Sequence, residues 1–290
     1  MKKILLQLDS DRTASVFDAV TAYDACADIL LQYGGVEAAE VRALVYGAMF
    51  TRGPSDLKNS AIFVGGTDVA KGEAMLKEVC GCFFGPLRTS VMLDANGCNT
   101  TATAAIVKLL SAADLRGKKA VVLAGTGPVG RRAAALLAKE GADVVVAETL
   151  PTETMERAKA ACATIEERFG VQVTPAAAAD VDATGRVLEG AEAVLCTGAA
   201  GLQLISETLW RGHPTLRVLG DVNAVPPAGI EGVKPTWNGK EIDGKLLFGA
   251  LGIGDLKMRV HRRSIARLFE QSDLVLDAEE IFALAKELSG

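Results

Sequence analysis

Three glycines stand at the spacing of a phosphate-binding turn, in the run from Gly125 to Gly130. The strand-like run KAVVLAG leads into this turn, and the helical run VGRRAAALLAKEG leads out of it. In that setting the first glycine allows a tight turn, the second lets a pyrophosphate approach the backbone, and the third lets the helix pack on the strand. The start of the helix adds N–H donors. We therefore predict a dinucleotide site; the alternative is a glycine turn without a ligand. The predicted cofactor-binding residues here are Gly125, Thr126, Gly127, Pro128, Val129 and Gly130.

A carboxylate follows at the place where a dinucleotide's adenosine ribose is recognised. Glu148 ends the next strand-like run, 18 residues after Gly130, where an acidic side chain accepts hydrogen bonds from the ribose hydroxyls. Thr149 and Leu150 come next, so no adjacent arginine is present for a 2′-phosphate. This favours NAD over NADP. Two alternatives stay open: a solvated strand-end carboxylate, and NADP binding through Arg131 or Arg132.

Two later strand ends carry small and polar residues suited to the nicotinamide ribose. Thr197, Gly198 and Ala199 follow the run Ala193–Cys196, and Asn223 follows Val218–Asp221. The carboxyl ends of parallel strands form the rim where such ligands bind. Ordinary strand-to-helix turns are the alternative for these residues.

The chain offers few groups for acid–base chemistry on an alcohol. Its two histidines, His213 and His261, lie in WRGHP and in the basic run LKMRVHRR, and we expect both to be structural or solvated. No Lys–Asp pair of the shikimate dehydrogenase kind is recognisable. Hydride loss from a carbon between two nitrogens needs no base, because the nitrogens stabilise the cation and the enzyme mainly aligns donor and acceptor. Methylene-pterins are substrates of this kind.

Strands and helices alternate along most of the chain, which predicts βαβ units and parallel sheets. The fold class is therefore α/β: a Rossmann-type dinucleotide lobe at 113–255, and a second α/β lobe at 1–112 completed by C-terminal helices at 256–290, with a cleft between them. The segment TPAAAADVDATG is typical of a surface loop and a helix start. The predicted strands are Ile4–Leu8, Ala61–Val64, Thr89–Leu93, Ala120–Ala124, Val144–Ala147, Val171–Thr174, Ala193–Cys196, Val218–Asp221 and Leu246–Ala250. The predicted helices include Ala14–Leu31, Val69–Phe83, Thr100–Ala112, Val129–Glu140, Leu256–Phe269 and Ala278–Leu288.

Composition narrows the class of protein further. The 290 residues carry a net charge of −5, which argues against general binding to nucleic acid or a membrane surface. No apolar run approaches the ~20 residues of a membrane span. The six cysteines are scattered with no CxxC pair, so we expect no metal site and a reduced, cytoplasmic protein.

Longer blocks of sequence resemble the NAD(P)-dependent methylene-tetrahydromethanopterin dehydrogenases of methylotrophic bacteria, nearly from end to end. The blocks are SVFDAVTAYDACAD, TRG, SAIFVGG, FFGPLRTSVMLDANGCNTTA, GKKAVVLAGTGPVG, VNAVPPAGI, FGALGIGDLKMRVHR and LDAEEIFALAKEL. The resemblance implies oxidation of 5,10-methylene- to 5,10-methenyl-tetrahydromethanopterin in one-carbon metabolism, and a homo-oligomer built on trimers. Some family members carry Gly then Arg where this chain has Glu148 and Thr149, which suits NADP.

The resemblance also implies particular substrate residues. Lys257 in GIGDLK matches a pterin-binding lysine, and a carboxylate or amide at Asp94, Asn96 and Asn99 suits the aminopyrimidine edge of a pterin; Lys257 and Asp94 are the implied catalytic positions. Solvated lysine and turn or cap chemistry are their alternatives, with Asn99 the expected helix cap. Two other functions stay open: a methylene-tetrahydrofolate dehydrogenase and a non-catalytic NAD-binding sensor. No tyrosine is followed by a lysine four residues on, so the cyclohydrolase activity of a related folate family is not expected. The implied substrate-binding residues are Asp18, Asp94, Asn96, Asn99 and Lys257; Asp18, like Asp24 on the same run, is less certain, since both could simply solvate a helix.

Overall fold

The computed structural model describes residues 1–289, which divide into two compact units. The first unit is Met1–Thr100 together with the carboxyl-terminal stretch that begins at Met258; the second is Thr101–Lys257. The division falls twelve residues earlier than the predicted boundary at 112 and two residues later than the one at 255. No helix among the described residues is both long and apolar enough to cross a membrane.

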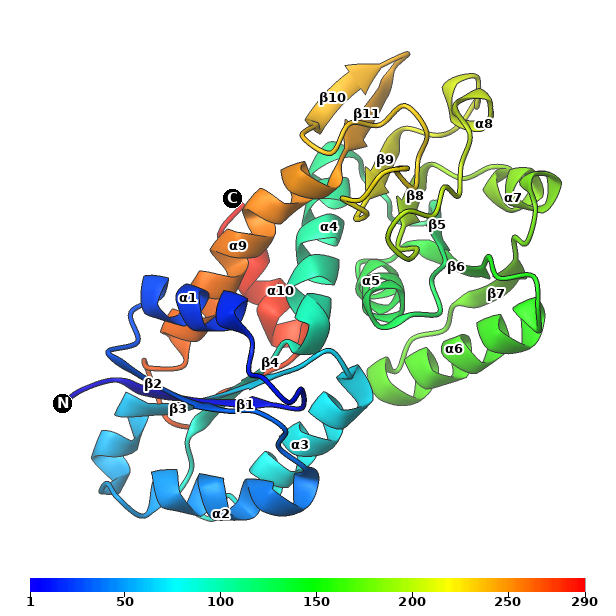
Figure 1. Cartoon of the computed structure of the whole chain (residues 1–290). Helices are drawn as coiled ribbons and strands as arrows, with labels where there is room; N and C mark the ends of the chain where they lie inside the picture. The colour runs from blue at the N-terminus through cyan, green and yellow to red at the C-terminus, as the bar shows by residue number, and fades with distance from the viewer. Residues whose placement is uncertain (290) are drawn as a thin grey trace. The chain divides into compact units, whose positions relative to one another are not determined.

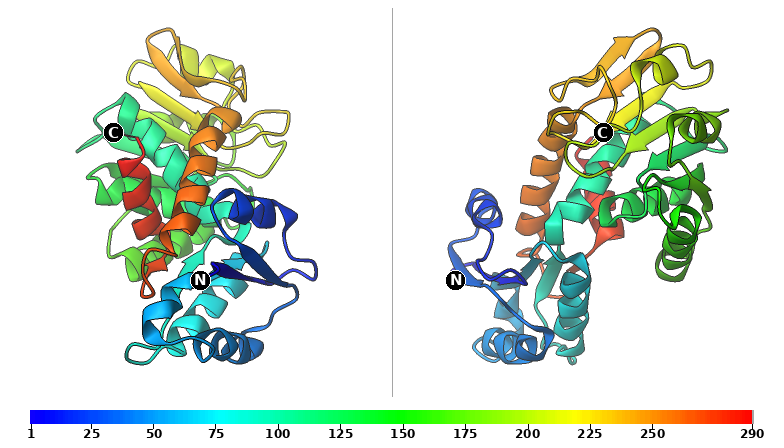
Figure 2. Two further views of the ribbon diagram at one scale, coloured as in Figure 1. Left: turned by 90° about the vertical axis from the view of Figure 1, so that its left-hand side faces the viewer. Right: turned by 45° about the vertical axis from the view of Figure 1, so that its right-hand side comes forward.

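The first unit is built on five parallel strands in the order β12-β4-β3-β1-β2. Every residue of β3 is buried, as expected for a central strand covered on both faces. Figure 1 shows α2 and α3 on one face of this sheet and α1 and α10 on the other, and the turned views of Figure 2 agree. The elements are β1 Ile4–Asp9, α1 Val16–Asp24, β2 Ile29–Tyr33, α2 Ala38–Met49, η1 Pro54–Asn59, β3 Ser60–Gly65, α3 Val69–Gly81, β4 Ser90–Leu93, η2 Ala95–Gly97, β12 Val275–Leu276 and α10 Ala278–Glu287.

The second unit is built on seven strands in the order β10-β11-β9-β8-β5-β6-β7, parallel except for the β10–β11 pair. Counted from β5, the order is 3-2-1-4-5-7-6, which matches the 3-2-1-4-5-6 order of a dinucleotide-binding fold when β11 takes the sixth place and antiparallel β10 is added beyond it; the switch point lies between β5 and β8. Trp210 and the buried faces of β8 and β9 lie in its core. The elements are β5 Lys119–Leu123, α5 Pro128–Lys139, β6 Asp143–Glu148, α6 Thr154–Phe169, β7 Thr174–Ala177, α7 Val181–Leu188, β8 Ala193–Cys196, α8 Glu207–Arg211, β9 Val218–Asp221, β10 Asn238–Ile242 and β11 Lys245–Phe248.

Two helices contain the boundaries between the units. Helix α4 spans Cys98–Ala112, and α9 spans Ala250–Arg267. The predicted start of α9 at Leu256 was too late, because Gly252 occurs where the helix packs on Trp237. A Cβ on Gly252 would lie 2.0 Å from the Trp237 carbonyl oxygen, so glycine is required there and hides the helical pattern. Ala250, predicted to end a strand, begins this helix instead.

Two further predictions of secondary structure were wrong. The region 14–31 is not one helix: α1 ends at Asp24, Cys26 has a left-handed φ of 88°, and the next apolar run forms β2 beside β1. A short apolar run does not by itself distinguish helix from strand. The third strand of the second unit lies at Thr174–Ala177, within the alanine-rich segment predicted to be a loop, because pairing with β6 outweighs alanine's low strand propensity.

Candidate active site

The glycine turn joins β5 to α5 at the switch point of the second sheet. A Cβ on Gly125 would lie 2.7 Å from the Val122 carbonyl oxygen, and one on Gly130 would lie 2.5 Å from the Gly125 Cα, so packing demands glycine at both. A Cβ on Gly127 would meet no protein atom within 4 Å. The backbone at Gly127 is therefore approachable, and Pro128 begins α5 directly after it. This geometry fits a pyrophosphate held at a helix amino terminus.

Thr197 holds the turn from the neighbouring strand. Its hydroxyl lies 3.0 Å from the carbonyl oxygens of both Leu123 and Ala124, and so can donate to either. Ala124 has a φ of 52°, a left-handed conformation that a residue with a Cβ adopts only at some cost. Thr197 therefore fixes a strained turn, while Gly198 is half-buried and Ala199 is exposed beyond it.

The carboxylate of Glu148 is buried at the carboxyl end of β6, with 2% of the residue exposed. One oxygen accepts the Thr126 hydroxyl at 2.6 Å and the Arg157 Nε at 2.9 Å. The other accepts the backbone N–H groups of Thr149 at 2.7 Å and Leu150 at 3.0 Å. Burial alone would raise the pKa of Glu148, but these hydrogen bonds together outweigh it and lower the pKa. A carboxylate has about four lone-pair positions, so all are engaged within the chain.

Arg157 is a functional candidate that sequence reasoning missed. It lies on α6, nine residues after Glu148, and its side chain is 49% exposed. Thr149 and Leu150, directly after Glu148, and Arg131 and Arg132, in the preceding helix, are the neighbours apparent from the sequence, whereas the packing of α6 beside β6 brings Arg157 to the carboxylate. Arg132 does not serve as an alternative, since it is 1% exposed and its Nη1 donates to the Pro128 carbonyl oxygen at 3.3 Å.

At the end of β9, Asn223 organises its own loop. Its Nδ2 donates to the Pro227 carbonyl oxygen at 3.1 Å, and its Oδ1 accepts the Val225 N–H at 2.9 Å. Behind it, Asp221 accepts the N–H groups of Asn223 and Ile230, and burial raises the pKa of Asp221. A cavity of about 370 Å³ lies along this loop and includes Asn223 in its lining.

In the first unit Asp18 and Asp94 lie near a histidine. His261 is 1% exposed, with Nε2 3.9 Å from Asp18 Oδ1 and Nδ1 3.9 Å from Asp94 Oδ2. Its ring stacks on Phe63 at 5.5 Å between centroids. The sequence predicts a structural or solvated His261 and gives no hint of its link to the two carboxylates.

Asp94 anchors the start of α4. Its Oδ1 accepts the backbone N–H groups of Asn99 and Thr100 at 2.9 and 3.0 Å, and its Oδ2 accepts the Thr100 hydroxyl at 2.6 Å. The sequence predicts Asn99 as the cap. Instead, the Asn99 Nδ2 donates to the Leu93 carbonyl oxygen at 2.6 Å and to Asp277 Oδ1 at 2.8 Å. Asn99 is fully buried, whereas Asn96 is exposed with a left-handed φ of 53°.

Lys257 lies well inside α9 and not at its start, because the helix begins at Ala250. Its side chain is half-buried, and it is the last residue of the second unit. The cluster of Asp18, Asp94 and His261 belongs to the first unit. Asp24, a less certain substrate residue, is exposed at the end of α1.

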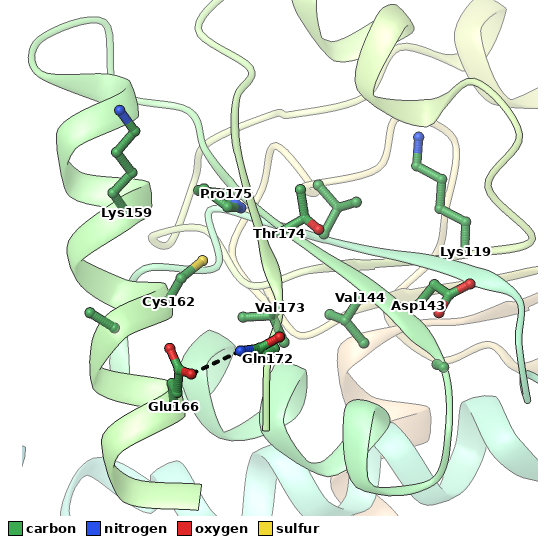
Figure 3. A pocket seen from close by; sticks show the side chains of 13 residues that line it. Lys119, Asp143, Val144, Lys159, Cys162, Glu166, Gln172, Val173, Thr174 and Pro175 are labelled. Carbon is green, nitrogen blue, oxygen red and sulfur yellow. Dashed lines mark hydrogen bonds between the residues drawn. The ribbon is translucent and has the colours of Figure 1, made fainter. Parts of the chain in front are cut away.

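A larger cavity, of about 720 Å³, lies at the amino ends of strands in the second sheet, opposite the glycine turn (Figure 3). It includes Lys119, Asp143 and Thr174, the first residues of β5, β6 and β7. Ligands in such sheets bind at the carboxyl ends of strands. Cys162 faces this cavity from α6, and burial raises its pKa to about 11, which leaves it a thiol at neutral pH. The glycine turn, and not this cavity, therefore has the position expected of a dinucleotide site.

Comparisons of sequence identify relatives along the whole chain. Residues 16–96 match the family model described as methylene-tetrahydromethanopterin dehydrogenase, N-terminal. The chain is 49% identical to the protein named bifunctional protein MdtA of Methylorubrum extorquens, over 99% of each chain. It is 31% identical to the NAD(P)-dependent methylenetetrahydromethanopterin dehydrogenase of the same organism, over 100% of this chain and 99% of the relative.

Solved structures share the fold at low sequence identity. Quinate dehydrogenase from Corynebacterium glutamicum in complex with NAD has a TM-score of 0.53 at 14% identity, over 100% of this chain and 99% of the other. Shikimate 5-dehydrogenase from Listeria monocytogenes, in complex with shikimate and NAD, has a TM-score of 0.52 at 13% identity, over 100% and 96%. These likenesses support the α/β, Rossmann-type architecture.

Proposed function

Because the chain belongs to the methylene-tetrahydromethanopterin dehydrogenase family, we propose that it transfers a hydride from 5,10-methylene-tetrahydromethanopterin to NAD(P). The product is the methenyl form. The observation that carries this proposal is the 31% identity, from end to end, to a relative named for this reaction. The glycine turn at a sheet switch point supports it independently.

The residues of the second unit fit a bound dinucleotide, whose nicotinamide ring supplies the hydride acceptor. The turn from Gly125 to Gly130 and the start of α5 bind the pyrophosphate. Thr126 and Glu148 form the adenosine end of the site, where the Thr126 hydroxyl already contacts the carboxylate. The loops after β8 and β9, with residues 197–199 and Asn223, form the nicotinamide end.

The reaction requires the chain to align the substrate with the cofactor, but it does not require a general base. The hydride leaves a carbon that is bonded to two nitrogens, and those nitrogens stabilise the resulting cation within the substrate itself. Holding donor and acceptor together then supplies most of the rate enhancement. The proposal therefore assigns no proton transfer to the chain.

We propose roles in pterin binding for the substrate residues one by one. Lys257 donates to a ring carbonyl or nitrogen, and Asp18, with a side chain 15% exposed, accepts N–H groups of the ring. Asn96 is exposed at the carboxyl end of β4 and suits a direct contact. Asp94 and Asn99 are buried and engaged in the chain's own hydrogen bonds, so we assign them a positioning role.

A spectrophotometric assay tests the proposal. Purified enzyme is supplied with the methylene forms of tetrahydromethanopterin and of tetrahydrofolate, each with NAD and with NADP, and methenyl-pterin formation is followed. We expect turnover with the tetrahydromethanopterin substrate. The more similar relative is named bifunctional, so the tetrahydrofolate arm is measured beside it. Binding of a nicotinamide without turnover of either pterin would favour a non-catalytic NAD-binding protein.

The proposal extends to assembly and compartment. We infer a homo-oligomer built on trimers; exposed apolar side chains of Val16, Val20 and Tyr23 on α1 support a subunit interface. The cysteines are all free thiols in the described structure, which suits a reducing compartment such as the cytoplasm.

A further inference from the structure

The adenosine end of the dinucleotide site carries a cation beside its carboxylate. The Arg157 Nε lies 2.9 Å from Glu148 Oε2, with side chains 49% and 3% exposed. The arginine is thus the outer member of the pair and the carboxylate the inner one. Thr126, from the glycine turn, contacts the same oxygen and so ties the pair to the expected pyrophosphate position.

This arrangement changes the charge that a ribose substituent meets. An isolated Glu148 would repel a 2′-phosphate, but an ion pair carries no net charge. Nε contacts the carboxylate, and a guanidinium has five N–H donors in a planar fork. The donors beyond the one on Nε suit bidentate contact with a phosphate. The carboxylate, by contrast, already accepts four donors from its own chain.

We propose that Arg157 is a specificity-determining residue that receives the 2′-phosphate of NADP, so that the Glu148–Arg157 pair, and not Glu148 alone, sets the choice of nicotinamide. NAD binds by sharing the Glu148 oxygens with its ribose hydroxyls. NADP binds by placing its phosphate on Arg157. The pair therefore admits both cofactors. The inference rests on the proposed dinucleotide site and goes beyond it.

Substitutions at Arg157 test the inference. We expect Arg157→Ala to lower the ratio of kcat/KM for NADP to that for NAD by about 10- to 150-fold, which is the affinity contribution of a charged hydrogen bond. Arg157→Gln retains an N–H donor for Glu148 without the charge, and we expect the same loss. Arg168→Ala is the matched control: the residue lies on the same helix, about 16 Å further along by the helical rise, and we expect the wild-type ratio.

A binding measurement separates this inference from the proposed function. Adenosine 2′,5′-bisphosphate and 5′-AMP are titrated calorimetrically into the wild type and each variant. We expect the wild type to prefer the bisphosphate and the Arg157 variants to lose that preference, whether or not the enzyme turns over a pterin. A preference that survives in both Arg157→Ala and Arg157→Gln overturns the inference. So does a loss that is larger for NAD than for NADP, since it makes Arg157 only a support for Glu148.

Discussion

Single residues in this chain owe their properties to donors from several elements, and Glu148 is the clearest case. Thr126 comes from the glycine turn, Thr149 and Leu150 follow β6, and Arg157 comes from α6. A buried carboxylate is tolerated only when hydrogen bonds stabilise its charge. The hydrogen bonds that orient Glu148 at the proposed adenosine end of the site therefore also stabilise the folded protein.

The unfolding free energy of the protein should depend on these hydrogen bonds in a way that changes at acid pH. The lowered pKa of folded Glu148 stabilises the protein above its unfolded pKa of about 4.3, and this contribution is lost as the pH falls through the folded pKa. We expect Glu148→Gln to be less stable than the wild type at pH 7 by roughly 1.5–3 kcal/mol. The difference should shrink as the pH falls from about 4.3. Urea unfolding between pH 3 and 7 measures it.

The control for that experiment is an exposed glutamate. Glu167 lies on the surface of α6, so Glu167→Gln should change the unfolding free energy little at any pH. A Glu148→Gln difference that stays constant with pH would contradict the linkage to this carboxyl.

Lys257 is the residue whose substitution should affect the pterin most directly. Lys257→Ala should lower kcat/KM for the pterin by about 10- to 150-fold, as expected for a lost charged hydrogen bond, while the Kd for the dinucleotide stays near the wild-type value. Initial rates at limiting pterin and calorimetric titration of the nicotinamide measure the two quantities. Arg259→Ala removes an exposed cation from the same helix and serves as the control. Unchanged kinetics in Lys257→Ala would remove the residue from the site.

At the scale of elements, several of the proposed site residues lie directly after the carboxyl ends of parallel strands. The turn at 124–127 follows β5, and Asp94 follows β4. A residue at such a position both shapes the next element and stands at the edge where ligands bind. Asp94 illustrates both roles: it accepts hydrogen bonds from the start of α4, and its Oδ2 lies 3.9 Å from His261 Nδ1.

The cap role predicts a stability effect for Asp94. Asp94→Ala leaves two backbone N–H groups and the Thr100 hydroxyl without their acceptor in a buried place, so we expect a loss of roughly 2–4 kcal/mol of unfolding free energy. Asp94→Asn keeps one acceptor oxygen, so its unfolding free energy should lie between those of the wild type and Asp94→Ala. Asp180→Ala removes an exposed cap of α7 and should cost about 1 kcal/mol. Equal losses in Asp94→Ala and Asp180→Ala would show that burial adds nothing at Asp94.

At the scale of the whole molecule, each unit contains a sheet of mainly parallel strands with its own switch point. In the first unit it lies between β1 and β3, and in the second between β5 and β8. The proposed pterin residue Asp18 belongs to one unit, while the dinucleotide residues belong to the other.

The proposed assembly is tested at this scale. Val16, Val20 and Tyr23 share one face of α1, with exposed fractions of 71%, 55% and 55%. We expect light scattering after gel filtration to give the mass of three chains or a multiple of it. Val20→Glu should shift the mass toward one chain, because burying a charge in an interface is costly. Val181→Glu, at an exposed position on α7, should leave the mass unchanged. A wild type with the mass of one chain would contradict the proposal.

Features formed by residues close together in the sequence could be predicted from the sequence alone. The spacing of Gly125, Gly127 and Gly130 specifies a turn, because close approaches of the backbone admit no side chain at the first and third of these positions. The strands Ala193–Cys196 and Val218–Asp221 were predicted with their observed bounds, since each is a short apolar run followed by turn residues.

Tertiary structure decided the features that depend on contacts between distant segments. The run Ile29–Tyr33 became a strand because β1 offered it partners. Arg157 meets Glu148, and His261 meets Asp18, only because helices α6 and α9 pack where they do. Residue spacing along the chain specifies local backbone conformation, but side chains on different elements are brought together by burial of apolar surface, which is non-directional and leaves no local pattern in the sequence.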